Sequence, residues 1–485
     1  MTFGRRLLTV TGVAAAMAAL VAAVRKEQHH LRTSRSQRNV DVARLGATVG
    51  KHYATNAARK LFASAERRIE LDQQRELRTA EAVAERLGNM KGALMKLGQM
   101  ASYIDDALPT PLRDALSALQ SNAPPMSAAL AAGVIEREFG MPPERLFVEW
   151  DPQPIAAASI GQVHRAVVLD PITGEERAVA VKVQYPGVGE AVEADLRNAN
   201  LLGMLLQQGF GGLDADDMVA EIKERLIEEL DYRLEAKNQQ LFADYFRGHP
   251  FIHVPDVLPS FSGSAVITSE LVNGSTWQDI QSWPQAEKDL IGETLFRFVF
   301  RSLYGMHAFN GDPHPGNYLF HGDGRVTFLD YGLVKHFTAT EIGTFIGMVK
   351  AAAYDHDQSE FRRIVESAGM LRPGCPAPDD ETGEYFSQFY ESVRHDQEVT
   401  WSSEYASAIM RHTFDRTSPI AQYATVPKAF VFIQRINLGL YALLGELQAK
   451  GNYRRIAEEL WPFVAGPAST PLAERERGWL DGLRR

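Results

Sequence analysis

Three short segments carry residues whose types and spacing fit one kind of chemistry. Lys182 lies in AVAVKV, where small and β-branched residues alternate, so we expect a lysine on a strand. Asp312 and Asn317 lie in NGDPHPGN with four residues between them, and Asp330 follows the apolar run VTFL. Phosphoryl transfer requires a lysine for the phosphates, ligands for Mg²⁺ and an acidic residue near the accepting hydroxyl. The three segments, in this order, predict a nucleotide-binding protein.

Each of these residues has an expected role. Lys182 would bind the α- and β-phosphates of ATP or ADP, and Asp330 and Asn317 would hold Mg²⁺. Asp312 would orient the attacking hydroxyl or water. One such segment alone is a weak signal, and the joint match in chain order is a strong one.

The lysine also needs a carboxylate to orient it, and the segment EELDYRLEAKNQ offers four. They are Glu228, Glu229, Asp231 and Glu235. On a continuous helix, Glu228, Asp231 and Glu235 would share one face. The alternative is that these residues form a solvated acidic helix face. The residues alone do not decide between such a face and a partner for Lys182.

Several parts of an ordinary protein kinase are missing. The stretch before Lys182 reads AAASIGQVH, with Gly161 as its one glycine. Asn310 and Gly311 stand where His and Arg would precede the catalytic aspartate, and no A-P-E follows the DYG turn. We therefore expect a kinase-like core without a platform for a peptide substrate.

These features together resemble the UbiB/AarF/ADCK family of atypical kinase-like proteins, over roughly residues 80–340. The family's K-x-G-Q helix is present at residues 96–99 and its alanine-rich loop as AAASIGQVHRA. The E-x-D pair, the following EAKN, the GDPHPGN loop and the DYG turn also match.

The resemblance implies an α+β, bilobal, protein-kinase-like fold: a small β-containing lobe, a mostly helical lobe and an N-terminal helical extension. It assigns Lys96 and Gln99 to a helix that lies over the active site, with Glu229 and Asp231 as partners across the site. Glu235 is then the expected ion-pair partner of Lys182. The residues implied to contact nucleotide in the alanine-rich loop are Ala156, Ala157, Ala158, Ser159 and Gly161.

Hydrophobic spacing and turn residues divide the chain into elements that would position these groups. Helix is expected over 40–120, over 190–245 and from 284 onward. Short strands are expected at 145–185, with a turn at 170–176, and again at 251–273. The expected segments are an apolar and basic arm (1–40), a helical extension (41–144), the small lobe (145–275) and the helical lobe with its tail (276–485).

Composition narrows the class of protein. The 485 residues are 45% hydrophobic and 23% charged, which excludes a disordered tail protein and a polytopic membrane protein. Cys375 is the one cysteine, so an internal disulfide framework and a multi-cysteine zinc site are excluded. The net charge of −10 argues against a nucleic-acid partner.

That net charge hides a basic N-terminal arm. Residues 1–60 carry eleven Lys and Arg against two acidic residues, and Leu7 to Val24 is uncharged. A membrane anchor is the favoured interpretation, ahead of a packed apolar helix and a signal peptide. The flanking charges then place the body on the cytoplasmic side. Expected partners are an anionic membrane surface or lipid, and either a second copy of the chain or proteins of a quinone or lipid pathway.

Other conspicuous residues are expected to be structural. His164 and His314 are interpreted as satisfied by local hydrogen bonds, and residues 432–449 as a core helix because Arg435 and Glu446 interrupt the apolar run.

The leading hypothesis is a membrane-associated, Mg²⁺-dependent ATPase or small-molecule or lipid kinase, serving isoprenoid-quinone or lipid metabolism by resemblance. The alternative is a nucleotide-dependent lipid-binding or remodelling protein that transfers no phosphate. A phosphotransferase of the antibiotic-kinase type ranks third, and a true protein kinase last.

Overall fold

The computed structural model describes residues 126–158, 160–170, 173–186, 230–414, 418–425 and 427–483, all within one compact unit, Pro124–Arg485. The apolar segment 7–24 and nearly all of the expected helical extension lie outside these residues. So do Lys96, Gln99, Ser159, Glu228 and Glu229. The boundaries of the four segments given above stay a prediction.

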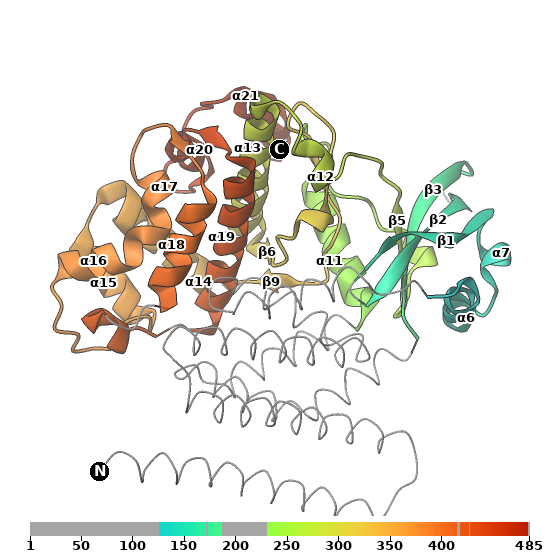
Figure 1. The fold of residues 1–485 in the computed structure, drawn as a ribbon, viewed down its shortest axis with the longest axis horizontal. Helices are drawn as coiled ribbons and strands as arrows, with labels where there is room; N and C mark the ends of the chain where they lie inside the picture. The colour runs from blue at the N-terminus through green and yellow to red at the C-terminus, as the bar shows by residue number, and fades with distance from the viewer. Residues whose placement is uncertain are drawn as a thin grey trace, which may run out of the picture. The chain divides into compact units, whose positions relative to one another are not determined.

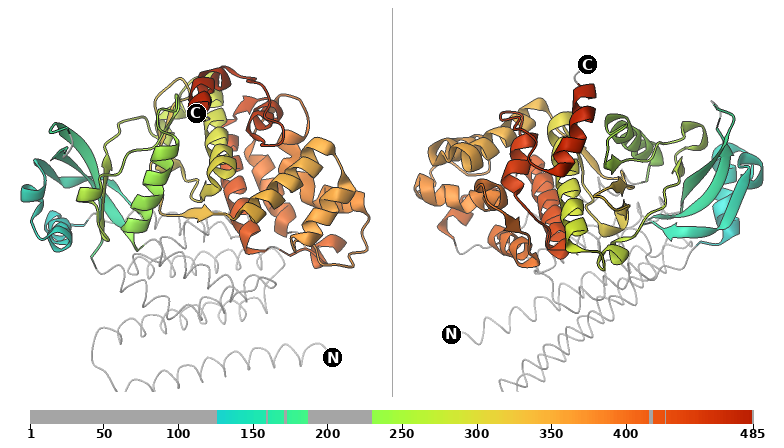
Figure 2. Two further views of the ribbon diagram at one scale, coloured as in Figure 1. Left: turned by 180° about the vertical axis from the view of Figure 1, so that it is seen from behind. Right: turned by 90° about the horizontal axis from the view of Figure 1, so that it is seen from above.

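The small lobe is built on a four-stranded antiparallel sheet with the order β1-β2-β3-β5 (Figures 1 and 2). Its strands are β1 (Glu149–Ala157), β2 (Gly161–Leu169), β3 (Glu176–Gln184) and β5 (Val266–Glu270). Alternate residues of β3, Val179, Val181 and Val183, are fully buried, as period-2 alternation requires of a sheet with one covered face. The expected pair of strands around 170–176 is confirmed.

Two helices precede this sheet, α6 (Ala128–Phe139) and α7 (Pro143–Leu146). The Ser127 hydroxyl caps α6 by accepting from the Leu130 amide, and Gly140 ends the helix with a φ of 73°. The buried face of α6 shares one hydrophobic core with the valines of β3. Although the sequence placed residues 128–139 in the extension, they pack as part of the small lobe.

Helix α11 (Tyr232–Tyr245) leads from the small lobe into the helical lobe. Asp231 caps it, and its buried face carries Tyr232, Glu235, Asn238 and Phe242 at helical spacing. This face therefore presents polar groups to the interior at its start and apolar groups further along.

The helical lobe is organised around α13 and α19, which run side by side (Figure 1). Its helices are α12 (Trp277–Ile280), α13 (Gln285–Arg301), α14 (Ala339–Val349), α15 (Gln358–Ser367), α16 (Asp379–Ser387), α17 (Glu391–Arg394), α18 (Ser403–Phe414), α19 (Lys428–Leu447), α20 (Tyr453–Leu460) and α21 (Pro471–Leu483). Two of them continue into π-helical turns, α13 into Ser302–Met306 and α14 into Lys350–Asp355.

Short strands in this lobe hold the loops that carry the motifs. They are β4 (Ile252–His253), β6 (Ala308–Asn310), β7 (Tyr318–Phe320), β8 (Val326–Phe328), β9 (Val334–His336), β10 (Val399–Thr400) and β11 (Lys450–Gly451). Strand β6 pairs with β9, and β7 pairs with β8. The GDPHPGN loop therefore runs between β6 and β7, and the DYG turn between β8 and β9.

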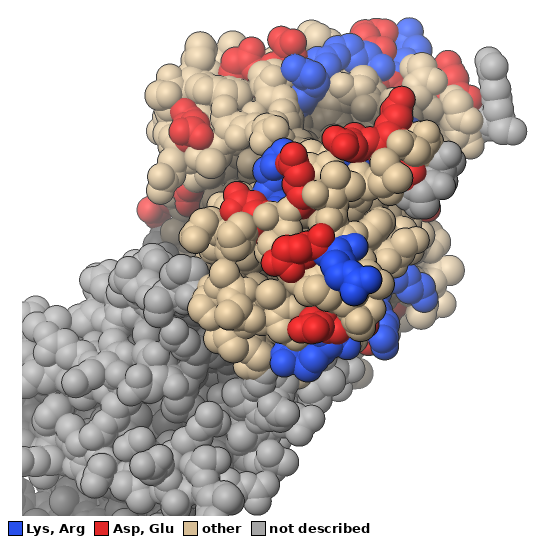
Figure 3. Space-filling view, turned by 90° about the vertical axis from the view of Figure 1, so that its right-hand side faces the viewer, with Lys and Arg blue, Asp and Glu red and all other residues tan. Residues whose placement is uncertain are grey.

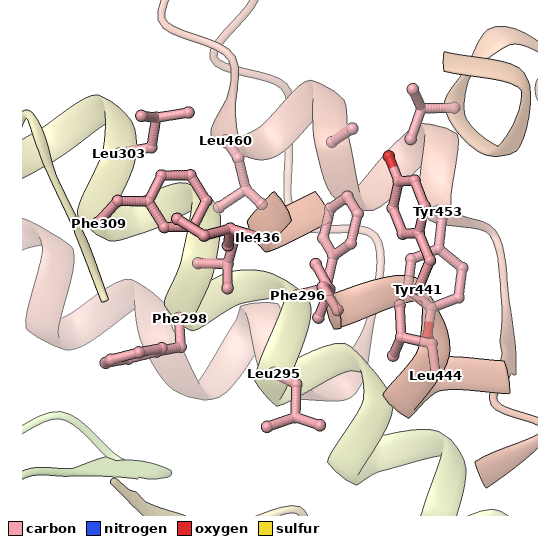
Figure 4. Packing of buried hydrophobic residues seen from close by; sticks show 14 of the residues in the cluster. Leu295, Phe296, Phe298, Leu303, Phe309, Ile436, Tyr441, Leu444, Tyr453 and Leu460 are labelled. Carbon is pink, nitrogen blue, oxygen red and sulfur yellow. The ribbon is translucent and has the colours of Figure 1, made fainter. Parts of the chain in front are cut away.

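The expected core helix at 432–449 is confirmed as α19. Ile436, Leu440, Leu444 and Leu447 are buried in the main hydrophobic cluster, part of which Figure 4 shows. Across the described ranges, no helix combines the length and apolar character needed to span a membrane.

A buried ion network fixes the last helix to this core. Arg297 on α13 has no exposed surface, and its guanidinium contacts Glu293 at 2.7 Å, Glu459 at 2.9 Å and Glu476 at 3.1 Å. Because an unpaired charge buried at this depth is very unfavourable, α20 and α21 must be in place for Arg297 to be satisfied.

Glu476 of α21 receives two further partners. Arg301 contacts it at 2.8 Å, and His249 Nε2 lies 3.1 Å from its Oε1. His249 Nδ1 accepts from the Ile252 amide at 3.0 Å, so Nε2 carries the proton of a neutral ring and donates to Glu476. Burial, the largest effect, lowers the pKa of His249, in agreement with a neutral ring.

Candidate active site

The structure forms the pair expected between strand lysine and helix carboxylate. Lys182 projects from β3 and its Nζ lies 2.6 Å from Glu235 Oε1, on the first turn of α11. The side chains are 16% and 6% exposed, so the pair is largely shielded from solvent. A shielded pair of this geometry fixes the ammonium more firmly than a surface pair would.

A second carboxylate and an aromatic ring complete the surroundings of Lys182. Asp330 Oδ2 lies 3.7 Å from Nζ, and the ring centroid of Tyr232 lies 5.1 Å from it. Burial lowers the pKa of Lys182, but the charges of Glu235 and Asp330 outweigh it and hold the pKa well above its usual value. The ammonium is therefore protonated at neutral pH and suited to bind phosphate.

The GDPHPGN loop is fixed by its own hydrogen bonds. Asn317 Nδ2 donates to the main-chain oxygen of Asp312 at 3.1 Å and to its Oδ2 at 3.3 Å. His314 Nδ1 accepts from the Gly316 amide at 3.1 Å, which confirms the expected structural role for this histidine. Asp312 is 6% exposed. The loop thus holds an aspartate and an asparagine in contact.

The DYG turn is anchored at both its main chain and its side chain. Asp330 Oδ1 accepts from the Gly332 amide at 3.0 Å, and Asn310 Nδ2 donates to the main-chain oxygen of Asp330 at 2.7 Å. Asn238 of α11 donates to the main-chain oxygen of Tyr331 at 3.4 Å. Residues from α11 and β6 therefore position the aspartate that faces Lys182.

Asp330 and Asn317 suit a magnesium ion by the chemistry of their donors. A carboxylate and an amide oxygen are hard ligands, and Mg²⁺ in phosphoryl-transfer sites usually takes one or two carboxylates plus phosphates and water. In the part of the chain that the structure describes, no group of three His, Cys, Asp or Glu residues could enclose a metal without a nucleotide. Asp330 and Asn317 are therefore candidate ligands for Mg²⁺, with Asp330 close to Lys182.

The chain matches the family described as ABC1 atypical kinase-like domain over residues 118–365. That stretch spans half of the sequence and contains every motif residue whose geometry is given above. The chain belongs to the ABC1 atypical kinase-like family. The resemblance to UbiB/AarF/ADCK proteins and the α+β bilobal fold are both confirmed.

Relatives of this ABC1 chain include organellar proteins. It is 35% identical over 291 residues to "Protein ACTIVITY OF BC1 COMPLEX KINASE 1, chloroplastic" of Arabidopsis thaliana. It is 34% identical over 298 residues to "Atypical kinase COQ8B, mitochondrial" of Rattus norvegicus. The matches cover 59% and 60% of this chain, and 42% and 54% of those two proteins. The chain thus spans about half the length of these relatives.

A solved structure is similar over more of the chain. The complex of Rv3197 with erythromycin from Mycobacterium tuberculosis has a TM-score of 0.58 and 31% identity to this ABC1 protein. The similarity covers 82% of this chain and 99% of that one. It therefore includes parts of the helical lobe beyond residue 365.

The alanine-rich stretch of this ABC1 protein forms the hairpin between β1 and β2. Ala156 and Ala157 are exposed at the end of β1, and the Ala158 amide donates to the Gly161 oxygen at 2.9 Å. A Cβ on Gly161 would lie 2.4 Å from the Val183 oxygen and 2.7 Å from the Tyr232 hydroxyl. Glycine is therefore required here by close strand packing, whatever its part in nucleotide binding.

One expectation about the acidic segment is wrong. Asp231 does not share a helical face with Glu235, because its backbone is extended and α11 begins at Tyr232. The Asp231 carboxylate instead accepts from the Arg233 amide at 3.0 Å as the helix cap. Its expected contacts with Lys96 and Gln99 lie outside the described residues, as does Glu229.

His164 has the structural role that the sequence analysis favoured. It is fully buried, and its Nδ1 and Nε2 lie 2.9 Å from the Asp151 oxygen and from Gln162 Nε2. Its ring stacks on Trp150. Both ring nitrogens are occupied by these protein contacts, so His164 is not placed to act as a ligand.

Sequence reasoning missed three residues that build the site. Tyr232 stands over Lys182, while Asn310 and Asn238 anchor the DYG turn. Asn310 was interpreted only as a missing kinase histidine. Asn310 directly precedes the Gly-Asp of the loop, and this position was the available signal that its side chain helps to position the site.

Proposed function

We propose that this ABC1-family chain is a Mg²⁺-dependent, ATP-binding atypical kinase that hydrolyses ATP or phosphorylates a small molecule or lipid. The observation that carries the proposal is the convergence on Lys182 of the helix carboxylate Glu235 and the DYG carboxylate Asp330. This arrangement provides a fixed cation for phosphate beside a candidate metal ligand, with Asp312 on the adjoining loop.

Each group has a separate task in this proposal. Lys182 binds the α- and β-phosphates, and Glu235 keeps its ammonium in place. Asp330 and Asn317 hold Mg²⁺, which when bound neutralises phosphate charge. Asp312 orients a hydroxyl or water toward the terminal phosphate, and its contact with Asn317 fixes the direction of its carboxylate.

We further propose that the process served is isoprenoid-quinone or lipid metabolism at a membrane. The support is the family membership, the relative named as an atypical kinase of mitochondria, and the basic, apolar arm in the sequence. On the face of the small lobe drawn in Figure 3, basic and acidic residues alternate without a continuous basic surface. The arm, by contrast, has a charge that suits anionic lipid.

A decisive test compares ATP turnover in wild type and in Asp330→Asn, with Mg²⁺ and vesicles containing anionic lipid. We expect a loss of about 100-fold in Asp330→Asn, because a neutral amide is a poorer ligand for Mg²⁺ and a weaker partner for Lys182. Asp323→Asn is the matched control, since Asp323 is exposed on the β7–β8 turn and has a φ of 52° that asparagine tolerates. Equal turnover in all three proteins would refute the catalytic assignment.

The second function is nucleotide-dependent lipid binding or remodelling without phosphoryl transfer. The relative solved in complex with erythromycin favours it, since that protein binds an organic molecule. The two functions separate in one measurement: mass spectrometry of a lipid extract incubated with enzyme, ATP and Mg²⁺. A phosphorylated product supports the kinase and ADP with unmodified lipid supports the ATPase, whereas intact ATP and unmodified lipid support the binding protein.

A further inference from the structure

The helical lobe contains a cavity of about 80 Å³ whose lining residues include none of the active-site residues. Half of its twenty lining residues are aromatic, and none of the twenty carries a charge. Representative wall residues are Phe300, Phe345, Phe430 and Trp461. A wall of this composition excludes ions and selects a neutral, largely apolar occupant.

Helix α19 contributes several polar side chains to this space, beside the tyrosines Tyr304 and Tyr390. Phe430, Gln434, Asn437 and Tyr441 recur at spacings of three and four and all line the cavity. The Tyr441 hydroxyl already donates to the Phe389 oxygen at 2.9 Å. Asn437 differs, because its Oδ1 is buried and no described residue donates a hydrogen bond to it.

A buried acceptor to which no group donates a hydrogen bond is unusual in a folded protein. Buried side-chain oxygens nearly always have a partner, and those that do not call for an explanation. A water would need two to four polar partners, and besides Asn437 the lining offers only Gln434 and three tyrosine hydroxyls, one of which already donates to Phe389. A ligand that brings its own hydrogen-bond donor would satisfy Asn437.

The backbone around the cavity is also irregular. Leu303 and Tyr304 belong to the π-helical turn Ser302–Met306, and Met348 and Val349 directly precede the π-helical turn at Lys350–Asp355. Such turns are rare and occur often at functional sites. Two of them beside one cavity add a second, independent reason to regard the space as a site.

We propose that this cavity binds a small, largely apolar molecule that carries one hydrogen-bond donor, and that Asn437 Oδ1 accepts that donor. An apolar cavity of about 150 Å³ holds benzene, so a space about half that size requires an occupant smaller than benzene, such as a short alkyl group or, with close packing, a five-membered ring. Aromatic side chains on several sides favour a flat ring. The site is independent of ATP chemistry and does not rest on the function proposed above.

The test uses two isosteric rings, pyrrole, which has an N–H donor, and furan, which has none. The full-length protein is labelled with ¹³C at the methionine methyl groups, because Met348 and Met370 both line the cavity and report on it directly. The other eleven methionines serve as internal references. Substitution of each reporter by leucine assigns its resonance.

We expect pyrrole to shift the Met348 and Met370 resonances saturably, with an affinity about tenfold higher than that of furan. Asn437→Leu should abolish the preference for pyrrole while furan still binds. Glu446→Gln is the matched control, because Glu446 is exposed on the same helix and does not line the cavity, and this variant should keep the preference. Should Asn437→Leu fail to fold, Asn437→Ala removes the same oxygen with a residue that favours helix.

Three results would each overturn the proposal. They are equal affinity for the two rings in wild type, a pyrrole preference that survives removal of the Asn437 amide, and reporter resonances that neither ring moves. None of them depends on ATP turnover, so the proposed function and this site can fail separately.

Discussion

At the scale of single residues, the position of Lys182 is determined by charges that act before any phosphate arrives. Its ammonium has lost most of its solvent, and Glu235 at 2.6 Å and Asp330 at 3.7 Å compensate for that loss. A cation held in this way needs little reorganisation when it binds an anion. Glu235 therefore acts on the lysine, and its effect should appear in nucleotide affinity.

Glu235→Gln tests this point. The variant keeps the shape of the side chain but removes its charge, so Lys182 should turn toward Asp330 and bind phosphate less well. We expect nucleotide affinity to fall about tenfold, measured by titration with a fluorescent nucleotide analogue. Glu176→Gln, exposed on the same strand β3, is the control and should match wild type. Unchanged affinity in Glu235→Gln would contradict the positioning role.

The sequence located residues that stand in a recognisable local pattern, whether or not their partners are close in the chain. Asp312 and Asn317 share a seven-residue loop, and Asp330 ends an apolar strand, so spacing alone was informative. Choosing Glu235 required the resemblance, because helix periodicity cannot show that α11 begins only after Asp231. The bond from Asn310 to Asp330 spans twenty residues, and no local pattern predicts it.

At the scale of elements, α19 connects the C-terminal part of the chain to the catalytic loop. Gly439 lies so close to the loop that a Cβ there would come within 2.2 Å of Pro313 Cγ. Pro313 is the neighbour of Asp312, so the helix supports the loop through direct backbone packing. The absence of a side chain at Gly439 is what allows that approach.

Gly439→Ala should therefore impair catalysis while the helix remains intact. The added methyl group must displace Pro313, and small displacements of catalytic groups are costly for rate. We expect ATP turnover to fall at least about tenfold, with an unchanged helical circular dichroism signal. Gly343→Ala on α14 is the control, because nothing lies within 4 Å of a Cβ there. Equal turnover in Gly439→Ala and wild type would show that the packing of α19 on Pro313 does not support the loop.

Helices and strands could be predicted where the hydrophobic pattern that specifies them lies within one short stretch of sequence. The alternation in β2 and β3 and the turn residues between them predicted the hairpin, and the apolar spacing of 432–449 predicted a core helix. The sequence did not show that α6 belongs to the small lobe, because a helix pattern does not reveal which hydrophobic core its apolar face joins. Ala131 and Ile135 look the same in sequence whether they face the β-sheet or another helix.

At the scale of the whole molecule, the helical lobe depends on residues beyond the family match, which ends at 365. Helices α19, α20 and α21 share the main hydrophobic core with α13. Glu476 adds an electrostatic link: burial acts to raise its pKa, but the bond from His249 and the charges of Arg301 and Arg297 lower it to about 2. The ionised carboxylate is therefore part of the folded structure.

Glu476→Gln should lower the free energy of unfolding at pH 7 by about 3 kcal/mol, because it removes the carboxylate that pairs with Arg301 and one of the three that surround Arg297. The pKa of Glu476 is lower when folded than its usual 4.5, so its stabilising effect is complete above pH 4.5. That effect is lost as the pH falls toward 2. The difference between wild type and variant should shrink over this range in urea unfolding curves.

The matched control is Glu474→Gln, two residues away on the same helix. Its ion pair with Arg477 is exposed on both sides, so its loss should change stability by less than about 1 kcal/mol at any pH. A Glu476→Gln protein as stable as this control would show that α21 is held by apolar packing alone.

The buried network also sets an order of events during synthesis. Arg297 is separated from Glu476 by 179 residues, and translation at roughly 5–20 residues per second takes on the order of ten to forty seconds to cover that interval. Throughout it, Arg297 can pair with Glu293 on its own helix but lacks Glu476. We expect the helical lobe to reach its full packing only once α21 is available, because Arg297 and Arg301 both pair with Glu476.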